Sequence, residues 1–286
     1  MISSSFLPSL ALLLSSTFWG LIWYPLRFLN QGGMNGVWAT GVMYSTALTI
    51  GLFWIIRGEV NIRPAPGPMV GLAVVLGWSQ LSFILAVIDG NIVRVMVLFY
   101  LSPLWATLFG YFFLQEYPSR IGVVALISAM TGTLVMLYQP SQGIPWPANG
   151  AEWLALSSGF TFALANVFTR KAQGISIRTK TVVAWLGITG AALAWASQSP
   201  LPPSSPSLWG VAMALGGLGI VFTTVATQYG VTHLPLSRSA TIMLFEVLVA
   251  TFSAQWLLQE PLSLREWLGG GLTLLGAYLA GRGTTD

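Results

Sequence analysis

The sequence predicts an all-α integral membrane protein with ten transmembrane helices, arranged as two inverted-topology five-helix repeats around a central cavity. Three observations carry this prediction. Apolar residues make up 55% of the 286 residues, and Asp, Glu, Lys and Arg only 7%, whereas a soluble domain has about 25% charged residues. Apolar stretches long enough to span a bilayer, roughly 20 residues each, recur along the whole chain. The two halves of the chain also resemble each other in sequence.

Breaks in hydrophobicity at charged residues, Pro, Gly and Asn divide the chain into candidate spans. The stretch before Leu29 has no basic region in front of it and is too long for a signal peptide, so we expect it to be the first span. The two longest connectors, 138–150 and 197–207, carry no charge and are rich in Pro, Ser or Gly. The ten expected spans are 7–29, 36–56, 68–88, 91–114, 119–138, 151–170, 180–198, 208–230, 235–258 and 264–282.

Basic residues give the expected orientation. With both termini in the cytoplasm, the cytoplasmic side receives most of the basic residues, in agreement with the positive-inside rule. The opposite orientation would reverse the distribution. On the cytoplasmic side are Arg57, Arg63, Arg120, Arg170, Lys171, Arg178, Lys180, Arg238 and Arg282, and on the far side are Arg27, Arg94 and Arg265. We therefore expect a multi-pass protein with both termini cytoplasmic.

An internal repeat divides the chain into residues 1–140 and 141–286. The segment LSSTFWGLIWYPLRF (14–28) aligns with LSSGFTFALANVFTR (156–170). RVMVLFYLSPLWATLFGYFFLQE (94–116) aligns with RSATIMLFEVLVATFSAQWLLQE (238–260), and both copies begin with Arg and end in Leu-Gln-Glu. Five spans per half is an odd number, so the halves would enter the membrane in opposite senses. Transporters use this plan, with the substrate bound near the midplane between the halves.

Short motifs, in their order and spacing, identify a family resemblance. They are FWG at 18–20, ALANV at 163–167, LSPLWATLFGYFFLQE at 101–116 and LFEVLVATFSAQWLLQE at 244–260. With them the chain resembles the drug/metabolite transporter superfamily in its ten-helix EamA-type branch, most closely the YddG group of amino-acid exporters. The second half of that family often has Glu-Pro where this chain has Glu246-Val247, while Pro103 is present in the first half. The ninth helix therefore lacks the proline that would kink it.

The resemblance implies a secondary transporter of the bacterial inner membrane. It would export amino acids, aromatic and other apolar or small ones, by alternating access. The alternative is a multidrug or cationic-compound exporter of the same fold. The expected partners are the lipid bilayer and a small amphipathic substrate, with no nucleic acid.

Glu246 is the first candidate site residue. It lies at the centre of the expected span 235–258, where a charge costs at least ~2.5–3.5 kcal/mol on insertion scales. One interpretation is a cavity carboxylate that binds a substrate ammonium group or carries a proton. The other is a carboxyl group hydrogen-bonded to a neighbouring helix, and the sequence leaves both open.

Aromatic and amide side chains are the further candidates. Trp19, Tyr24, Trp78 and Tyr100 lie within expected spans and could form an aromatic pocket that stacks on a side chain and contacts an ammonium group. The alternative for each is packing or lipid contact. The amide groups of Gln80 and Asn166 need hydrogen-bond partners that lipid cannot supply. Each could hold the α-carboxylate or α-amino group of a substrate, or bond to another helix.

Prolines and small residues suggest how the helices bend and pack. Pro25 and Pro103 fall inside expected spans and permit kinks, so we expect hinges there. Small residues line the fifth and tenth spans, where close helix approach is expected. We expect scaffold or homodimer contacts at these stripes, which consist of Gly122, Ala125, Ala129 and Gly132, and of Gly269, Thr273, Gly276, Ala277 and Ala280.

Other function classes find little support in the sequence. The chain has no cysteine and a single histidine, His233, placed at an expected cytoplasmic turn, so we expect no metal site, no cofactor and no catalytic residues. A phosphate-binding loop of the Walker type is missing, which argues against ATP as the direct energy source. Arg94 and its repeat mate Arg238 are interpreted mainly as membrane-border anchors, and Asp89 could pair with Arg94. We therefore expect neither an enzyme nor a channel.

Overall fold

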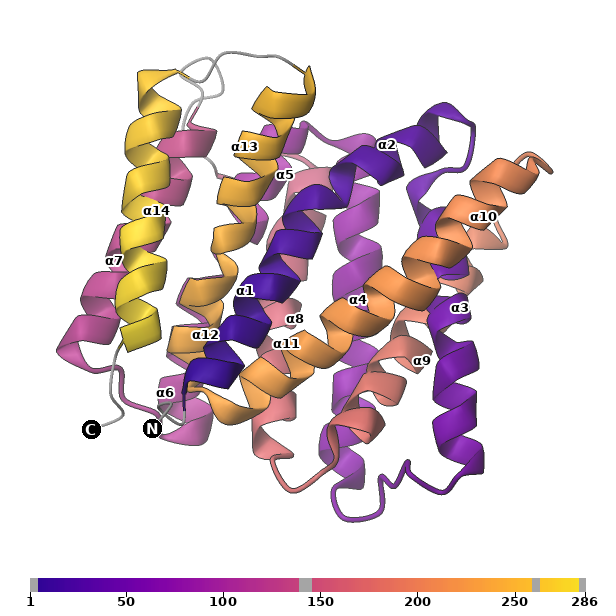
Figure 1. Cartoon of the computed structure of the whole chain (residues 1–286), viewed down its shortest axis with the longest axis horizontal. Helices are drawn as coiled ribbons and strands as arrows, with labels where there is room; N and C mark the ends of the chain where they lie inside the picture. The colour runs from indigo at the N-terminus through magenta and orange to yellow at the C-terminus, as the bar shows by residue number, and fades with distance from the viewer. Residues whose placement is uncertain (1–4, 139–145, 259–262, 283–286) are drawn as a thin grey trace.

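The computed structural model describes residues 5–138, 146–258 and 263–282, and every regular element in these ranges is helical (Figure 1). Each of the ten predicted stretches is helical. The largest boundary differences are three residues, at Ile177 against a predicted 180 and at His233 against a predicted 230. The helices are α1 (Phe6–Leu21), α2 (Trp23–Gln31), α3 (Gly36–Ile56), α4 (Pro66–Asp89), α5 (Ile92–Phe99), α6 (Ser102–Leu114), α7 (Arg120–Leu137), α8 (Gly150–Lys171), α9 (Ile177–Ala196), α10 (Pro206–Ala214), the π-helical η2 (Leu215–Ile220), α11 (Val221–His233), α12 (Leu236–Met243), α13 (Phe245–Leu258) and α14 (Leu264–Arg282).

Seven helical segments in the described ranges are long and apolar enough to cross a membrane. They are Phe6–Gln31, Gly36–Ile56, Pro66–Asp89, Arg94–Leu114, Arg120–Leu137, Pro206–His233 and Leu236–Leu257. Helices α8, α9 and α14 have 22, 20 and 19 residues and so have sufficient length. They are not among the seven, although the sequence predicts them as spans. The repeat boundary at 140/141 and the final Gln259-Glu260 of the second repeat copy lie outside the described residues.

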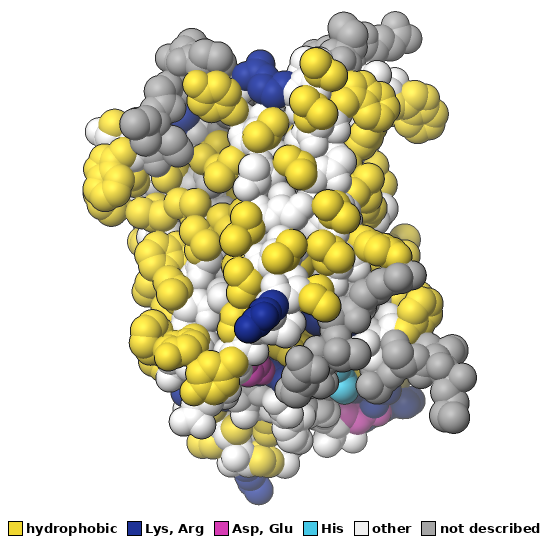
Figure 2. Space-filling model, turned by 90° about the vertical axis from the view of Figure 1, so that its left-hand side faces the viewer, with side chains coloured by type: hydrophobic (Ala, Val, Ile, Leu, Met, Phe, Trp, Pro, Cys, Tyr) yellow, Lys and Arg dark blue, Asp and Glu magenta, His cyan; other side chains and the backbone are white. Residues whose placement is uncertain are grey.

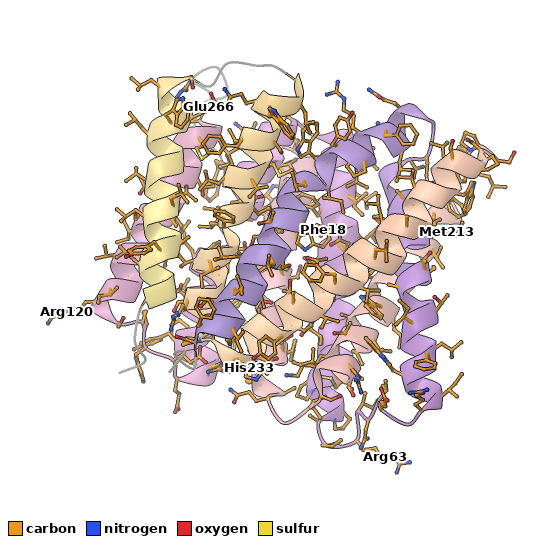
Figure 3. The ribbon with its side chains drawn as sticks, in the orientation of Figure 1. Phe18, Arg63, Arg120, Met213, His233 and Glu266 are labelled. Atoms are coloured by element: carbon orange, nitrogen blue, oxygen red, sulfur yellow. The ribbon has the colours of Figure 1, made fainter. Side chains whose placement is uncertain are left out.

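Helices from the two halves of the chain interleave. In the first half, α4 packs against α8 and α9 of the second half, α3 packs against α9, and α1 packs against α11 and α13. Helix α1 begins and α14 ends at the same end of the bundle (Figure 1). Arg63, Arg120 and His233 lie toward that end, and Glu266 lies toward the opposite end (Figure 3). Figure 2 looks onto the side that α7 and α14 form, where apolar side chains are spread from end to end and a Lys or Arg side chain lies among them in the lower half.

The small residues of α7 and α14 bring these two helices into close contact. A Cβ atom on Gly276 would lie 2.6 Å from the carbonyl oxygen of Ala125, and one on Gly269 would lie 2.6 Å from that of Gly132. The predicted scaffold contact is therefore formed within one chain. These small-residue faces cover each other in one chain, and a homodimer stays a prediction.

In the described ranges three long helices are interrupted, and two of the interruptions lie just before a proline. The break between α1 and α2 falls at Ile22, before Pro25, and the break between α5 and α6 falls at residues 100–101, before Pro103. A proline cannot donate to the carbonyl group four residues earlier. The third break, at Leu244, occupies the repeat position of Tyr100 and has Val247 in place of the proline. There the chain makes a tighter turn, in which the Leu244 amide donates to the Thr241 carbonyl (3.3 Å).

Candidate functional site

A cavity of about 130 Å³ lies among helices of both halves. Four of the residues predicted from the sequence line it, Trp19 of α1, Gln80 of α4, Asn166 of α8 and Glu246 of α13. Lining side chains that sequence reasoning missed are Tyr44, Phe83, Phe99 and Phe162, together with Ser79, Ser158 and Thr169. Thr224, Thr227 and Gln228, whose polar groups within a span also need partners that lipid cannot supply, line the cavity as well. The cavity thus combines aromatic walls, hydroxyl and amide groups, and one carboxyl group.

Glu246 and Tyr100 meet at the two helix breaks. Tyr100 follows the end of α5, and Glu246 lies in the first turn of α13, just past Leu244. The Tyr100 hydroxyl donates to Oε1 of Glu246 at 3.1 Å. Both residues line a small neighbouring pocket that shares Phe99, Asn166 and Glu246 with the cavity, whereas Tyr100 is not among the residues that line the cavity itself. Glu246 is thus hydrogen-bonded to another helix and is also a cavity residue, so the two interpretations of its role are compatible.

Phe99 is the centre of the aromatic wall. Its ring lies 4.9 Å from that of Phe83, 5.4 Å from that of Tyr100 and 5.8 Å from that of Phe162, measured between centroids. These rings come from α4, from the α5–α6 break and from α8. Such tilted and edge-on arrangements are the ones that aromatic rings prefer. They give the cavity a rigid wall on which an apolar or aromatic side chain can pack.

Tyr24 and Trp78 do not line the cavity, which corrects two sequence-based predictions. Their side chains are 52% and 44% exposed on the outside of the bundle. The neighbouring Ser79 faces inward instead, and its hydroxyl donates to the Ser158 carbonyl at 3.0 Å.

The two predicted amide groups face the cavity without a partner in the protein. In the described ranges, no hydrogen bond involves the side chains of Gln80 or Asn166, although Asn166 is only 6% exposed. By contrast, the Gln228 amide oxygen accepts a hydrogen bond from the Thr169 hydroxyl at 3.1 Å. Gln80 and Asn166 are therefore free to bind a polar ligand, whereas Gln228 also joins two helices.

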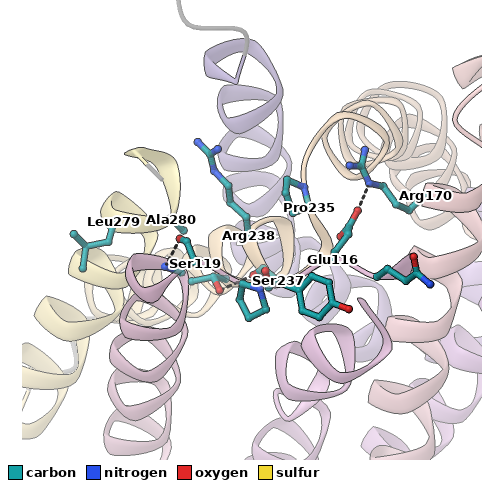
Figure 4. A pocket seen from close by; sticks show the side chains of 13 residues that line it. Glu116, Ser119, Arg170, Pro235, Ser237, Arg238, Leu279 and Ala280 are labelled. Atoms are coloured by element: carbon teal, nitrogen blue, oxygen red, sulfur yellow. Dashed lines mark hydrogen bonds and ion pairs between the residues drawn. The ribbon is translucent and has the colours of Figure 1, made fainter. Parts of the chain in front are cut away.

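An ion pair lies at each end of the bundle beyond the cavity. At the end where α1 begins, Arg170 of α8 donates to Glu116 at 2.6 Å, and Glu116 accepts from the Leu236 amide at 2.8 Å (Figure 4). This pair borders a second cavity of about 490 Å³. At the opposite end, Arg94 donates to both oxygens of Glu152 at 2.7 and 2.8 Å. The expected Asp89 is not the partner of Arg94.

Both ion pairs connect α8 with the α5–α6 segment. Arg94 and Glu116 stand at the two ends of the α5–α6 segment, and Glu152 and Arg170 stand near the two ends of α8. Helix α8 is thus joined to the broken helix on both sides of the cavity. Among the described residues, no group of three His, Cys, Asp or Glu side chains could hold a metal ion. The arrangement suits non-covalent binding of a small ligand that carries an ammonium group.

Comparisons with known proteins agree with this architecture. The model of the EamA-like transporter family matches residues 7–138 and again residues 149–282. A curated protein named as an uncharacterized transporter, from Archaeoglobus fulgidus, is 26% identical over 291 aligned positions, which cover 96% of this chain and 98% of that protein. A solved crystal structure superposes with a TM-score of 0.73, covering 97% of this chain and 97% of the other at 18% identity.

Proposed function

The chain belongs to the EamA-like transporter family, and from this premise we propose that it is a secondary transporter that exports amino acids across the bacterial inner membrane. Its substrates would be aromatic and other apolar or small amino acids. Membrane transport of small molecules follows from the family. The substrate class and the direction of transport rest on the chemistry of the cavity.

The observation that carries the substrate class is Glu246. It is the one carboxyl group among the described residues that line the cavity, and it is fixed by the 3.1 Å hydrogen bond from Tyr100. The ammonium group of a substrate would bind Glu246, and the side chain of the substrate would pack on Phe99 and Phe162. The free amide groups of Gln80 and Asn166 supply donors for a carboxylate. A zwitterion satisfies all of these groups.

Alternating access gives the two ion pairs opposite roles. Residues 1–140 and 141–286 would form two inverted five-helix repeats, with α8, α9 and α14 also crossing the membrane. Arg170–Glu116 would close the cytoplasmic side and Arg94–Glu152 the outer side. Breaking one pair while the other holds would open the cavity to one side at a time. The helix breaks beside Tyr100 and Glu246 are the natural bending points for this motion.

Cytoplasmic termini are part of the same proposal. Helix α1 begins and α14 ends at one end of the bundle, which is also the end of Arg63 and Arg120 (Figures 1 and 3). Basic residues favour the cytoplasmic side. The cavity of about 490 Å³ beside Glu116 would then face the cytoplasm.

Counterflow in liposomes tests the proposed function. Purified protein would be reconstituted with labelled amino acids and, separately, with lipophilic cations, with and without a pH gradient. We expect exchange of aromatic amino acids, and we expect Glu246→Gln to raise their KM by about 10- to 100-fold because a charge-assisted hydrogen bond is lost. Glu59→Gln is the matched control, because Glu59 pairs with Arg178 away from the cavity.

Two outcomes would contradict the proposal. Exchange of lipophilic cations without amino acids would identify a cationic-compound exporter instead. Full amino-acid transport by Glu246→Gln, with unchanged pH dependence and normal expression, would remove any essential role of the Glu246 charge.

A further inference from the structure

Lys180 is a cation buried inside the bundle. It lies in the first turn of α9 and has no exposed surface. Its Nζ donates to the Thr232 hydroxyl at 2.9 Å. The ion pairs among the described residues are Arg94–Glu152, Arg170–Glu116 and Arg178–Glu59, and Lys180 belongs to none of them. A buried ammonium group without an anionic partner is costly.

The surroundings of Lys180 carry an excess of positive charge. Thr232 accepts from Lys180 at its hydroxyl and from Arg170 at its carbonyl, the latter at 2.6 Å. Two cations therefore converge on one residue of α11. Among the described residues, the carboxylate that an ion pair brings to these cations is Glu116, which is bound to Arg170. These two cations and one carboxylate leave a net positive charge, which one further anion would neutralise.

The cluster lies directly against the central cavity. Ala184, one helical turn after Lys180, lines the cavity, and so does Gln228, one turn before Thr232. The Thr232 hydroxyl donates to the Gln228 carbonyl at 2.6 Å. The helical turn from Gln228 to Thr232 thus separates Lys180 from the cavity. Lys180 lies between the cavity and the end of the bundle that carries Arg170 and Glu116.

We propose that Lys180 binds the carboxylate of the amino acid when the cavity opens to the cytoplasm, an inference that rests on the proposed function. Opening that end requires the contacts of Arg170 with Glu116 and with Thr232 to break. Movement of α11 away from α8 and α9 would also break the hydrogen bond between Lys180 and the Thr232 hydroxyl. The ammonium group would then face the path into the cavity, and a substrate carboxylate would replace Thr232 as its acceptor.

This role makes Lys180 a determinant of specificity. It would select molecules that carry a carboxylate before they reach Glu246, which binds the ammonium group. The two recognition steps would lie at different depths of the pathway. A monocation of similar size and shape would meet repulsion from Lys180 and Arg170 on its way in.

The test compares an amino acid with its amide, in oriented proteoliposomes that expose the cytoplasmic face. We expect Lys180→Met to raise the KM for phenylalanine at that face at least about tenfold. The KM for phenylalaninamide should stay the same or fall, because the variant removes a charge that repels this monocation. Lys180→Arg keeps the charge and should restore most of the affinity. Lys171→Met is the matched control, because Lys171 is an exposed lysine at the same end of the bundle.

Several outcomes would overturn the inference. It fails if Lys180→Met raises both KM values equally, or if it lowers only the maximal rate, since a purely structural role would do either. If Lys180→Met does not fold, Thr232→Val provides the second test. Removal of the competing hydroxyl should lower the KM for phenylalanine and not that for the amide, and an unchanged or raised KM would contradict the proposal. If the wild type exchanges the amide and not the amino acid, the proposed function itself fails.

Discussion

Removal of one partner from the ion pair between Arg94 and Glu152 should destabilise the protein strongly. The Glu152 carboxylate is 3% exposed and accepts four hydrogen bonds, two from Arg94 at 2.7 and 2.8 Å, one from the Ala148 amide at 2.9 Å and one from Asn149 at 3.1 Å. Arg94→Met would leave this carboxylate buried with two neutral donors. Removal of one partner from a buried pair costs roughly 3–5 kcal/mol.

A matched pair on the same chain provides the control. In the Arg178–Glu59 pair the side chains are 55% and 28% exposed, and pairs exposed to water contribute about 0–1 kcal/mol. Arg178→Met should therefore have a small effect. The assay is equilibrium unfolding of the purified variants in detergent micelles, followed by circular dichroism.

The double variant isolates the charge from the packing. Arg94→Met combined with Glu152→Met leaves no uncompensated charge, so it should be more stable than Arg94→Met alone. The reasoning is refuted if Arg94→Met and Arg178→Met destabilise the protein equally. It is refuted as well if the double variant is less stable than Arg94→Met by the full effect of a second, independent loss.

Two further predictions concern packing and bending. Gly276→Val should lower the free energy of unfolding by about 1–3 kcal/mol, because its Cβ would lie 2.6 Å from the Ala125 carbonyl oxygen. The control Gly190→Ala has open space around its Cβ and should raise the free energy of unfolding by about 0.5–1 kcal/mol. Equal effects of the two variants in thermal unfolding would contradict the close packing of α7 and α14. Pro103→Ala should keep the rate of counterflow within about twofold, since the helix of the second half is interrupted at Leu244, the equivalent of Tyr100, without a proline. Loss of transport at normal expression would show that the proline itself is needed.

The helices were predictable because lipid imposes a simple length rule. Each expected span needed only a long apolar run with polar or turn residues at its ends. The family match is consistent with the internal repeat, because the same model fits residues 7–138 and 149–282. Membrane orientation and the inverted relation of the halves stay predictions.

The inward faces of the helices could not be predicted in the same way. In a membrane both the lipid-facing and the buried sides of a helix are apolar, so hydrophobic periodicity does not separate them. For this reason Trp78 was assigned to the cavity although it faces outward, and Phe99 and Phe162 were missed. Residues with strong hydrogen-bonding needs, such as Gln80 and Glu246, were candidates for the cavity or for a bond to another helix, and both line the cavity.

Two features had no local signal in the sequence. Lys180 lies near the end of a span, where a lysine is usually a border residue, but in the folded chain it is buried and donates to Thr232 of α11. The break at Leu244 has neither proline nor glycine at its own position. In both cases contacts between helices decide the local structure.

Side-specific labelling of single cysteines tests the central claim, that two inverted repeats surround the cavity, most directly. The chain has no cysteine of its own, so Gly174→Cys, Ser204→Cys and Ser263→Cys would each report on one connector. With a membrane-impermeant maleimide, the account predicts that position 174 reacts only from the cytoplasm, and that positions 204 and 263 react only from outside. Reaction of positions 174 and 204 from the same side would mean that α9 does not cross the membrane, and it would contradict the inverted repeat.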